Sequence, residues 1–306
     1  MAKNKSLLIS GTVALSICSI LWGLDGVVLT PRLYNLPPPF VVFILHAIPF
    51  IVMNLFFYGY YNLLQPLSPK IKLFLFLTSM LGGALGTLAI VKALFLVNFQ
   101  SLSVVVLLQK LQPVFAISLA AIILKEKIQK GFVAWAFIAI AAGYFLTFGF
   151  SRPNFDTGSN TGLAAVFSLL AAISFGASIV FSRSVAQHLP FQAATFFRYG
   201  ITTFIMLMIT AATGTLFSFE SITATNWVVI AIIIFTTGSG AIFLYYYGLK
   251  RVPATIASIV ELLYPLSAII FDYVFNEKAL SALQWISAAV MVFAIVKITF
   301  PKKRSA

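Results

Sequence analysis

The sequence predicts an all-α polytopic membrane protein, with ten transmembrane helices arranged as two inverted five-helix repeats. Three observations lead to this prediction. Hydrophobic residues make up 61% of the chain and charged residues only 9%. The chain divides into ten apolar runs. Its second half repeats features of its first half, and a shift of 152 residues brings the two halves into register.

The composition excludes a soluble domain, in which about a quarter of the residues are charged. The net charge of +13 would suit a nucleic-acid partner, but Lys and Arg lie between the apolar runs and not in a stripe with interleaved aromatic residues. We therefore expect no nucleic-acid partner. The single cysteine, Cys18, and two isolated histidines cannot build a metal cluster, so the sequence predicts no cofactor. Cys18 is expected to face lipid or another helix.

Each apolar run is long enough for a spanning helix, which needs roughly 20 mainly apolar residues. The breaks between the runs carry proline, glycine and other turn residues. The first run is too long for the core of a signal peptide and lacks a small-residue cleavage site, so we interpret it as the first span. The predicted spans are about 7–29, 40–62, 72–95, 101–124, 131–150, 162–182, 191–213, 226–249, 254–276 and 281–300.

The basic residues predict the topology, because cytoplasmic loops are rich in Lys and Arg. With the N-terminus inside, 13 of the 20 Lys and Arg residues fall on the inner side, and only Arg32, Arg152 and Lys278 fall on the outer side. Both termini are therefore predicted to be cytoplasmic. Two groups of tyrosines near the inner ends of spans are expected to form an aromatic belt at the membrane interface. They are Tyr58, Tyr60, Tyr61, Tyr245, Tyr246 and Tyr247.

The internal repeat aligns individual residues of the two halves. The aligned pairs are Pro113 with Pro265, Gln109 with Glu261, and His46 with Arg198. Since five spans per repeat is an odd number, the second repeat must enter the membrane upside down relative to the first. We predict a first repeat over residues 1–150 and a second over residues 151–306. Such inverted repeats are typical of transporters that work by alternating access.

Four ionisable side chains are predicted near the middle of the membrane: His46, Lys110, Arg198 and Glu261. An ionisable group there costs about 2.5–3.5 kcal/mol on insertion scales, so it is kept where it faces a cavity or a partner. Asp25 and Asp272 lie near the outer ends of spans 1 and 9, and we expect both to reach the membrane surface.

The central ionisable groups predict one cavity lined by helices 1, 2, 4, 7 and 9. Glu261 would carry a proton or meet a cationic group of the solute, while Lys110 and Arg198 would meet a carboxylate or phosphate. The alternative is an ion-pair lock that joins Glu261 to Lys110 or Arg198, although buried ion pairs rarely stabilise a fold.

Further residues are predicted to line the same cavity by their helical spacing. They are Trp22, His46, Gln109 and Tyr264. For His46 two interpretations stay open, a pH-sensitive gate and a neutral histidine bonded to a backbone carbonyl. For Trp22, helix packing is the alternative to an aromatic wall.

Two prolines, Pro113 and Pro265, lie at matching positions inside spans 4 and 9. Each removes a backbone hydrogen bond and frees a carbonyl that must face protein or water. They predict paired hinges or unwound points at the site, with a static kink as the alternative. Glu126 and Glu277 lie beside lysines at the ends of the same spans and are interpreted as boundary or gate residues.

These features together resemble the drug/metabolite transporter superfamily, in its ten-helix form with two EamA-type domains. The resemblance covers nearly the whole chain and rests on Leu21-Trp22-Gly23, the two prolines, the glutamates that follow them, and Arg198. The chain departs from the family pattern at Phe175-Gly176, which stands where the first half has Trp22-Gly23. The resemblance implies transport of amino acids, metabolites, nucleotide sugars or drugs, often outward.

The function predicted from these observations is secondary transport of a small organic solute, such as an amino acid or related metabolite, across the cytoplasmic membrane of a prokaryote. The chain has no GxxxxGK[ST] loop, so the sequence gives no sign of ATP hydrolysis. The expected mechanism is alternating access, with export as one direction, in a monomer or homodimer surrounded by membrane lipid. The alternatives are a channel or membrane scaffold and, with less support, an intramembrane enzyme.

Overall fold

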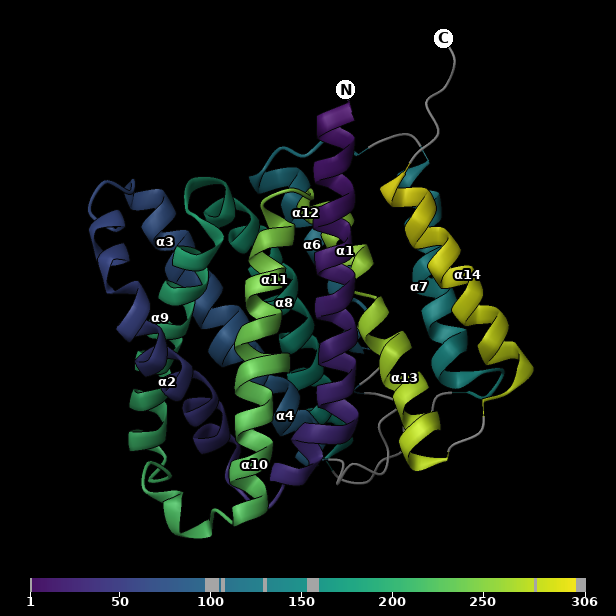
Figure 1. Ribbon diagram of the computed structural model, residues 1–306. Helices are drawn as coiled ribbons and strands as arrows, with labels where there is room; N and C mark the ends of the chain where they lie inside the picture. Colours follow the sequence, from purple (N-terminus) through teal and green to yellow (C-terminus); the bar gives the residue numbers. More distant parts are fainter. Residues whose placement is uncertain are drawn as a thin grey trace.

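The computed structural model describes residues 2–96, 105, 108–128, 131–152, 160–277 and 280–300 (Figure 1). These residues form helices, turns and irregular segments, with no strand among them. In the first half of the chain the helices are α1 (Ala2–Leu24), the π-helical η1 (Asp25–Leu29), the 3-10 helix η2 (Thr30–Leu33), α2 (Pro38–Phe57), the 3-10 helix η3 (Tyr58–Leu63), α3 (Pro69–Thr78), the π-helical η4 (Ser79–Leu85), α4 (Gly86–Leu96), α6 (Gln112–Ile123) and α7 (Phe132–Phe148).

The second half follows the same order of long helices. Its elements are α8 (Thr161–His188), α9 (Phe191–Ala212), the 3-10 helix η5 (Ser218–Ser221), α10 (Ala224–Ile233), the π-helical η6 (Ile234–Gly238), α11 (Ser239–Leu249), α12 (Ala254–Val260), α13 (Leu263–Asn276) and α14 (Ala282–Thr299). Several helices begin at a residue whose side chain caps the first turn. Ser68 caps α3, and capping boxes open α10 at Thr223 and α14 at Ser281.

Eight helical stretches within the described residues are long and apolar enough to cross a membrane. They correspond to the predicted spans 1, 2, 3, 6, 7, 8, 9 and 10. The other two predicted spans appear as the shorter apolar helices α6 and α7. Residues 101–104, 106 and 107 of the predicted span 101–124 lie outside the described residues, as do Lys278 and most of the loop between the halves. The polytopic all-α class is thus confirmed, and the number ten stays a prediction.

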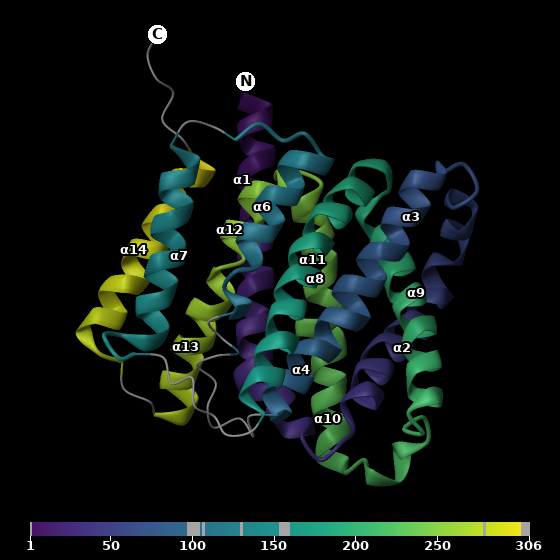
Figure 2. The same cartoon turned by 180° about the vertical axis from the view of Figure 1, so that it is seen from behind.

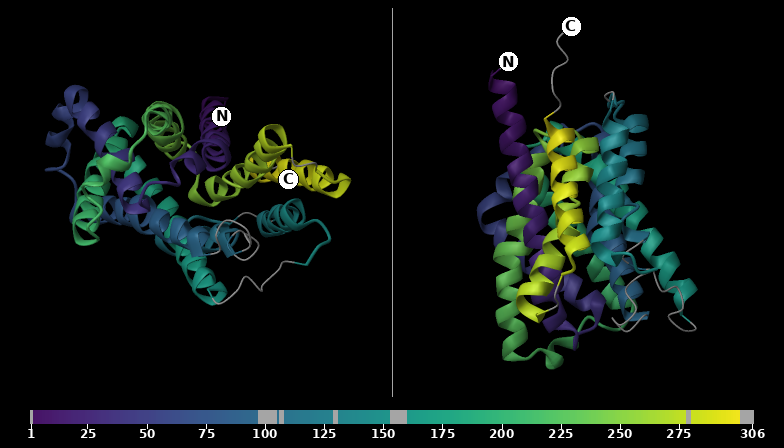
Figure 3. Two further views of the ribbon diagram at one scale, coloured as in Figure 1. Left: turned by 90° about the horizontal axis from the view of Figure 1, so that it is seen from below. Right: turned by 90° about the vertical axis from the view of Figure 1, so that its right-hand side faces the viewer.

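The helices pack in pairs that recur between the two halves (Figures 1 and 2). Helix α1 packs against α11 and α13, and α8 packs against α4 and α6 in the corresponding way. Helix α2 lies along α9, and α7 along α14, which form opposite flanks of the molecule in the view from below (Figure 3). Helix α6 ends at the same end of the bundle where α1 begins, whereas α13 ends at the opposite end.

Spans 4 and 9 are interrupted at matching points. A turn at Lys110 and Leu111 precedes α6, and a turn at Glu261 and Leu262 separates α12 from α13. The prolines therefore lie in the first turn of the helix that follows each break. A proline is well tolerated there, because its missing N–H would have no helical partner anyway. The irregular backbone thus precedes each proline, and the role of the prolines as hinges stays a prediction.

The downstream ends of these two spans also match. Lys125 and Glu277, which are 152 residues apart, have φ angles of 54° and 55° and are the only non-glycine residues with positive φ in the described part of the chain. A left-handed residue directly after a helix satisfies the last carbonyl groups, which makes it a common helix stop. The repeat thus extends to an uncommon backbone conformation.

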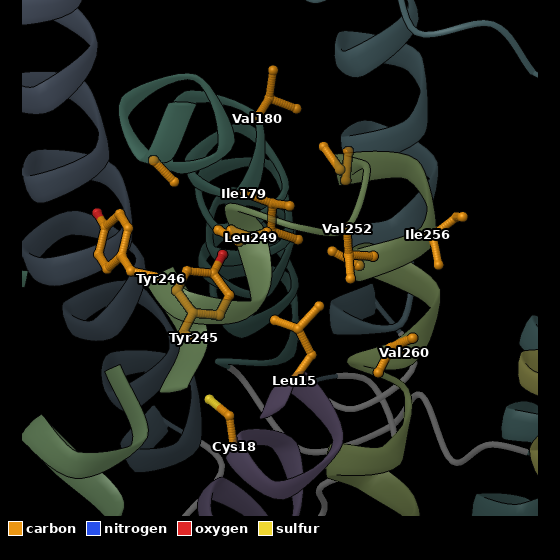
Figure 4. Close-up of a cluster of buried hydrophobic side chains, with 14 of the residues drawn as sticks. Leu15, Cys18, Ile179, Val180, Tyr245, Tyr246, Leu249, Val252, Ile256 and Val260 are labelled. Atoms are coloured by element: carbon orange, nitrogen blue, oxygen red, sulfur yellow. The ribbon is translucent and has the colours of Figure 1, made fainter. Parts of the chain in front are cut away.

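The main core lies where α1, α8, α11 and α12 meet (Figure 4). Helices α1 and α11 approach closely because glycines face each other. A Cβ atom on Gly248 would lie 2.6 Å from Leu15 Cγ, and one on Gly11 would lie 2.7 Å from Arg251 Cβ. Small residues allow such close packing in membrane bundles. Cys18 is fully buried in this core, so it faces other helices and not lipid.

Candidate functional site

Five polar side chains from four parts of the bundle form what we call the central polar cluster. They are Gln112 at the start of α6, Arg198 on α9, Tyr245 and Tyr246 on α11, and Glu261 at the break between α12 and α13. The cluster combines residues from both halves of the chain. It therefore exists only because the two halves pack face to face.

Glu261 is held by an amide and not by a cation. Gln112 Nε2 donates to Glu261 Oε2 at 2.9 Å. The other carboxylate oxygen, Oε1, is buried and has no hydrogen-bond partner among the described residues. Within the same residues no ion pair joins Glu261 to Lys110 or Arg198, although Arg198 lies within electrostatic range. The ion-pair lock is thus not formed in this conformation, and the Tyr245 hydroxyl is the other polar group beside the carboxylate.

Arg198 is only 7% exposed and lies among tyrosine rings. Its Cζ atom lies 5.9 Å from the ring centroid of Tyr245 and 6.0 Å from that of Tyr246. A guanidinium over an aromatic face is attracted to the ring, and more strongly where water is excluded. Gly82 on η4 makes room for it, since a Cβ atom there would lie 3.0 Å from Arg198 Nη2. The hydroxyl group of Tyr246 lies 3.4 Å from that of Ser182, which fixes this ring.

Trp22 borders the cluster from α1. Its ring lies 5.5 Å from that of Tyr245, at an interplanar angle of 51°. Trp22 is half-buried, whereas Tyr245 is 3% exposed. The indole thus borders the cluster, and the choice between an aromatic wall and helix packing stays open.

His46 lies on α2 at the side of the cluster. Its Nδ1 atom donates to the carbonyl oxygen of Val42 at 2.8 Å, because a carbonyl oxygen can only accept. The imidazole also packs on Tyr199, with ring centroids 5.0 Å apart. Of the two interpretations left open by the sequence, the structure shows the histidine bonded to a carbonyl.

Lys110 does not join the cluster. Its Nζ atom lies 3.6 Å from the position that a Cβ atom on Gly143 of α7 would occupy, and Met291 of α14 is the neighbouring side chain. The residue is 7% exposed, and Nζ has no hydrogen-bond partner among the described residues. The predicted cavity with Lys110, Arg198 and Glu261 together is therefore not assembled in this conformation.

The remaining predicted wall residues are divided. Gln109 is half-buried beside the break in span 4. The Tyr264 hydroxyl lies 3.3 Å from the position of a Cβ atom on Gly26, so it faces η1 and not the central polar cluster. Among the described residues, neither of these two side chains forms a hydrogen bond with Glu261.

Glu126 lies at the boundary where the sequence places it, with partners that the sequence could not show. Its carboxylate accepts from Ala254 N at 2.8 Å, from Thr255 N at 3.0 Å and from Thr255 Oγ1 at 2.9 Å. It therefore caps the N-terminus of α12, where the helix dipole favours a negative charge. Glu277, at the corresponding end of α13, is exposed. Glu126 thus joins the two halves at one end of the bundle.

Three residues of the cluster were missed or misread from the sequence. Gln112 shares a helix face with Gln109, three residues earlier, but only Gln109 was predicted as a wall residue. Tyr245 and Tyr246 were assigned to an interfacial belt, and this is wrong, since they are 3% and 0% exposed. Three consecutive tyrosines on a helix point in three directions. Which of them face inward depends on the rotation of α11 about its axis, and the sequence does not show this rotation.

Comparisons with known proteins identify the kind of protein to which this site belongs. The model of the EamA-like transporter family matches residues 9–148 and again residues 162–300. A relative named riboflavin transporter ImpX, from Fusobacterium nucleatum subsp. nucleatum, is 45% identical over 293 residues, which are 95% of this chain and 98% of that protein.

A solved crystal structure of another protein has the same fold. It superposes with a TM-score of 0.73 at 17% sequence identity, over 94% of this chain and 95% of that one. The family expected from the sequence resemblance is confirmed. The chain belongs to the EamA-like transporter family, and it is an integral membrane transporter of a small solute, not an enzyme.

Proposed function

We propose that this protein carries riboflavin, or a closely related flavin, across the cytoplasmic membrane by alternating access. The observation that carries the proposal is the 45% identity to a riboflavin transporter over almost the full length of both proteins. The sequence alone favoured an amino acid or related metabolite, and that class remains the second candidate. The specific observation in its favour is that the cluster holds one cationic and one anionic side chain, Arg198 and Glu261, which would suit a zwitterion.

The central polar cluster suits a flavin in chemical terms. The isoalloxazine ring of riboflavin is flat and uncharged at neutral pH, and one edge alternates carbonyl acceptors with an N–H donor. Arg198 offers several donors in a fixed plane, and the carboxylate of Glu261 offers acceptor oxygens. The rings of Trp22 and Tyr245 offer aromatic faces, which pack on a flat ring in offset or edge-to-face geometry.

Alternating access would come from two inverted repeats, residues 1–150 and 151–306. Support comes from the two separate family matches, from the recurring helix pairs, and from the opposite directions of α6 and α13. In this proposal ten spans cross the membrane, and the breaks before Pro113 and Pro265 act as hinges. Such breaks lie near substrate sites in carriers built from inverted repeats.

The proposed location is the cytoplasmic membrane of a prokaryote, with both termini inside. The bacterial source of the relative and the excess of Lys and Arg in the predicted inner loops support this location. We keep export as one direction of transport, in a monomer or homodimer surrounded by lipid. We expect no nucleic-acid partner.

A counterflow assay tests the proposed function. Purified protein is reconstituted into liposomes loaded with unlabelled riboflavin, and the entry of labelled riboflavin is followed. A carrier gives transient accumulation that saturates with concentration, whereas a channel gives only equilibration. Liposomes in which the protein molecules of one orientation are blocked then allow the flux in each direction to be measured separately. A panel of labelled amino acids in the same assay tests the second candidate.

Empty liposomes and liposomes with the Arg198→Ala variant serve as controls. Saturable riboflavin counterflow in the wild type alone supports the proposal. Counterflow of an amino acid without any riboflavin movement would replace the flavin by the second candidate.

A further inference from the structure

Helix α1 changes its pitch at Asp25, where the π-helical η1 begins. The N–H group of Thr30 donates to the carbonyl oxygen of Asp25, five residues earlier, which is the bond of a π-helix. This wide turn also brings the two side chains together, since Thr30 Oγ1 donates to Asp25 Oδ1 at 3.1 Å. Single π-turns inside α-helices occur frequently at functional sites.

A second π-helical segment, η6, packs against this part of the molecule. Helix α1 contacts η6, and α10 contacts η1. Thr237 of η6 lies next to the Asp25 carboxyl group and is only 1% exposed. Its hydroxyl oxygen has no hydrogen-bond partner of good geometry among the described residues. Since it interacts with the Asp25 carboxyl group, this hydroxyl is a second oxygen beside the carboxylate, after that of Thr30.

A third hydroxyl comes from α13. The Tyr264 oxygen lies 3.3 Å from the position that a Cβ atom on Gly26 would occupy, one residue after Asp25. Gly26 therefore lets the Tyr264 hydroxyl approach the backbone of η1. Together the side chains of Asp25, Thr30, Thr237 and Tyr264 form an all-oxygen group, which we call the Asp25 oxygen cluster.

The charges around this cluster leave the carboxylate without a counter-ion. Among the described residues no Lys or Arg forms an ion pair with Asp25. The titratable groups that face it are Tyr264 from α13 and Tyr199 from α9, while Arg32 of η2 is exposed. The neighbouring η6 and α10 carry no titratable side chain. A charged carboxylate inside a membrane protein is costly unless a cation accompanies it.

We propose that the Asp25 oxygen cluster binds a monovalent cation, Na⁺ or a proton, that couples to solute movement. Carboxylate, hydroxyl and carbonyl oxygens are the donors that hard cations prefer. In other membrane carriers, coupling ions bind where helices depart from regular α geometry. The coupling to a flavin rests on the function proposed above, whereas the cation site itself does not.

Helix α13 connects the Asp25 oxygen cluster to the central polar cluster. Tyr264 lies at the start of this helix, and its N–H group donates to the carbonyl oxygen of Glu261 at 3.0 Å. A cation that pulls the Tyr264 hydroxyl toward Asp25 would therefore change the break at Glu261. This gives a short structural path from the cation to the solute site.

The melting temperature of the purified full-length protein tests the cation site without any transport assay. NaCl is titrated against choline chloride at constant ionic strength. We expect Na⁺ to raise the melting temperature saturably in the wild type by mass action. We expect no rise in Asp25→Asn and a several-fold higher Na⁺ requirement in Thr237→Val, which keeps the shape and removes the hydroxyl.

Asp272→Asn is the matched control, because Asp272 was also predicted near an outer helix end but bonds to Asn276 on its own helix. It should respond to Na⁺ as the wild type does. If Na⁺ has no effect, infrared spectra in acidic and alkaline buffer decide for the proton. The proton assignment requires a carboxylic-acid band that persists in the wild type at neutral pH, where an ordinary aspartate is ionised, and that Asp25→Asn removes.

The absence of both the Na⁺ shift and this infrared band would overturn the proposal. So would an equal loss of either signal in Asp272→Asn. Flavin binding is measured separately, by quenching of flavin fluorescence. A cation response without flavin binding would therefore leave the cation site standing and overturn only the proposed substrate.

Discussion

The two halves of this protein share a backbone plan and differ in chemistry. Spans 4 and 9 both break before a proline, and both end in a left-handed residue 152 positions apart. At the first break Lys110 points toward α7 and α14, while at the second Glu261 belongs to the central polar cluster. In the same way His46 bonds to its own helix, whereas its counterpart Arg198 lies among tyrosines.

The difference shows that two halves with the same helix arrangement can place their polar residues in one cluster. The recurring helix pairs require only small residues at contacts and breaks at set positions, so both halves keep them. A polar group at the centre needs partners, and the two halves supply different neighbours to corresponding positions. The second half contributes both charged residues of the central polar cluster, whereas the first half contributes Gln112 and places Trp22 at its border.

The largest expected effect separates Arg198 from His46. We expect Arg198→Ala to lower riboflavin flux by roughly 100-fold, since it removes the donors of a charged group, whose hydrogen bonds contribute about 1.5–3 kcal/mol each, and the contacts with the tyrosine rings. His46→Ala should lower it by only about threefold, since it loses one neutral hydrogen bond and one ring contact. Counterflow rates at equal amounts of reconstituted protein measure both. Equal effects of the two variants would contradict the asymmetry.

The second comparison concerns Glu261. We expect Glu261→Gln to lower riboflavin flux by roughly 10- to 100-fold, because a hydrogen bond to a charged group contributes about 1.5–3 kcal/mol. The folded protein should remain, since the new amide can still accept from Gln112. Size-exclusion profiles check folding, and liposome flux checks transport. Wild-type flux from this variant would remove Glu261 from the transport path.

The third comparison concerns Lys110, the ionisable group at the other break. We expect Lys110→Met to leave riboflavin flux within about threefold of the wild type and to stabilise the protein by about 1–3 kcal/mol, because an unpaired buried donor is replaced by an apolar chain. Thermal unfolding in detergent measures the stability. A loss of flux as large as that of Glu261→Gln would place Lys110 in the solute site of another conformation.

The smallest expected effect concerns the two helix-end glutamates. We expect Glu126→Gln to lower the free energy of unfolding by about 1 kcal/mol, because it weakens the cap on α12. Glu277→Gln should change it by less than about 0.5 kcal/mol, because Glu277 is exposed. Chemical unfolding in detergent measures both. If Glu126 is also a gate, its variant should raise the rate of solute leak in liposomes, and Glu277→Gln should not.

Much of the fold could be predicted from the sequence because a membrane imposes simple requirements. Long apolar runs must be helices, since every backbone polar group needs an internal partner. The breaks at Pro113 and Pro265 were predictable for the same reason. The predicted cavity was less accurate. Lys110 was grouped with Arg198 and Glu261 by depth alone, and depth does not tell which neighbour a helix face meets.

Asp25 illustrates the same limit. Its position near the end of a span suggested a group that reaches the membrane surface. The structure leaves Asp25 half-buried at a π-helical segment and places it next to Thr237, from a span about 200 residues later. Neither the π-turn nor this neighbour could be read from the sequence, because a π-turn changes the rotation of the helix within an apolar stretch.

The sequence by itself determined the membrane class, the family and the pattern of breaks, because these follow from hydrophobicity, charge bias and residues that local backbone geometry requires. The tertiary structure decided which polar groups meet. Gln112 reaches Glu261 across 149 residues of chain, and Tyr245 and Tyr246 turn toward Arg198. Such contacts depend on the rotation of each helix about its axis, and an apolar stretch that is hydrophobic on all sides does not specify that rotation.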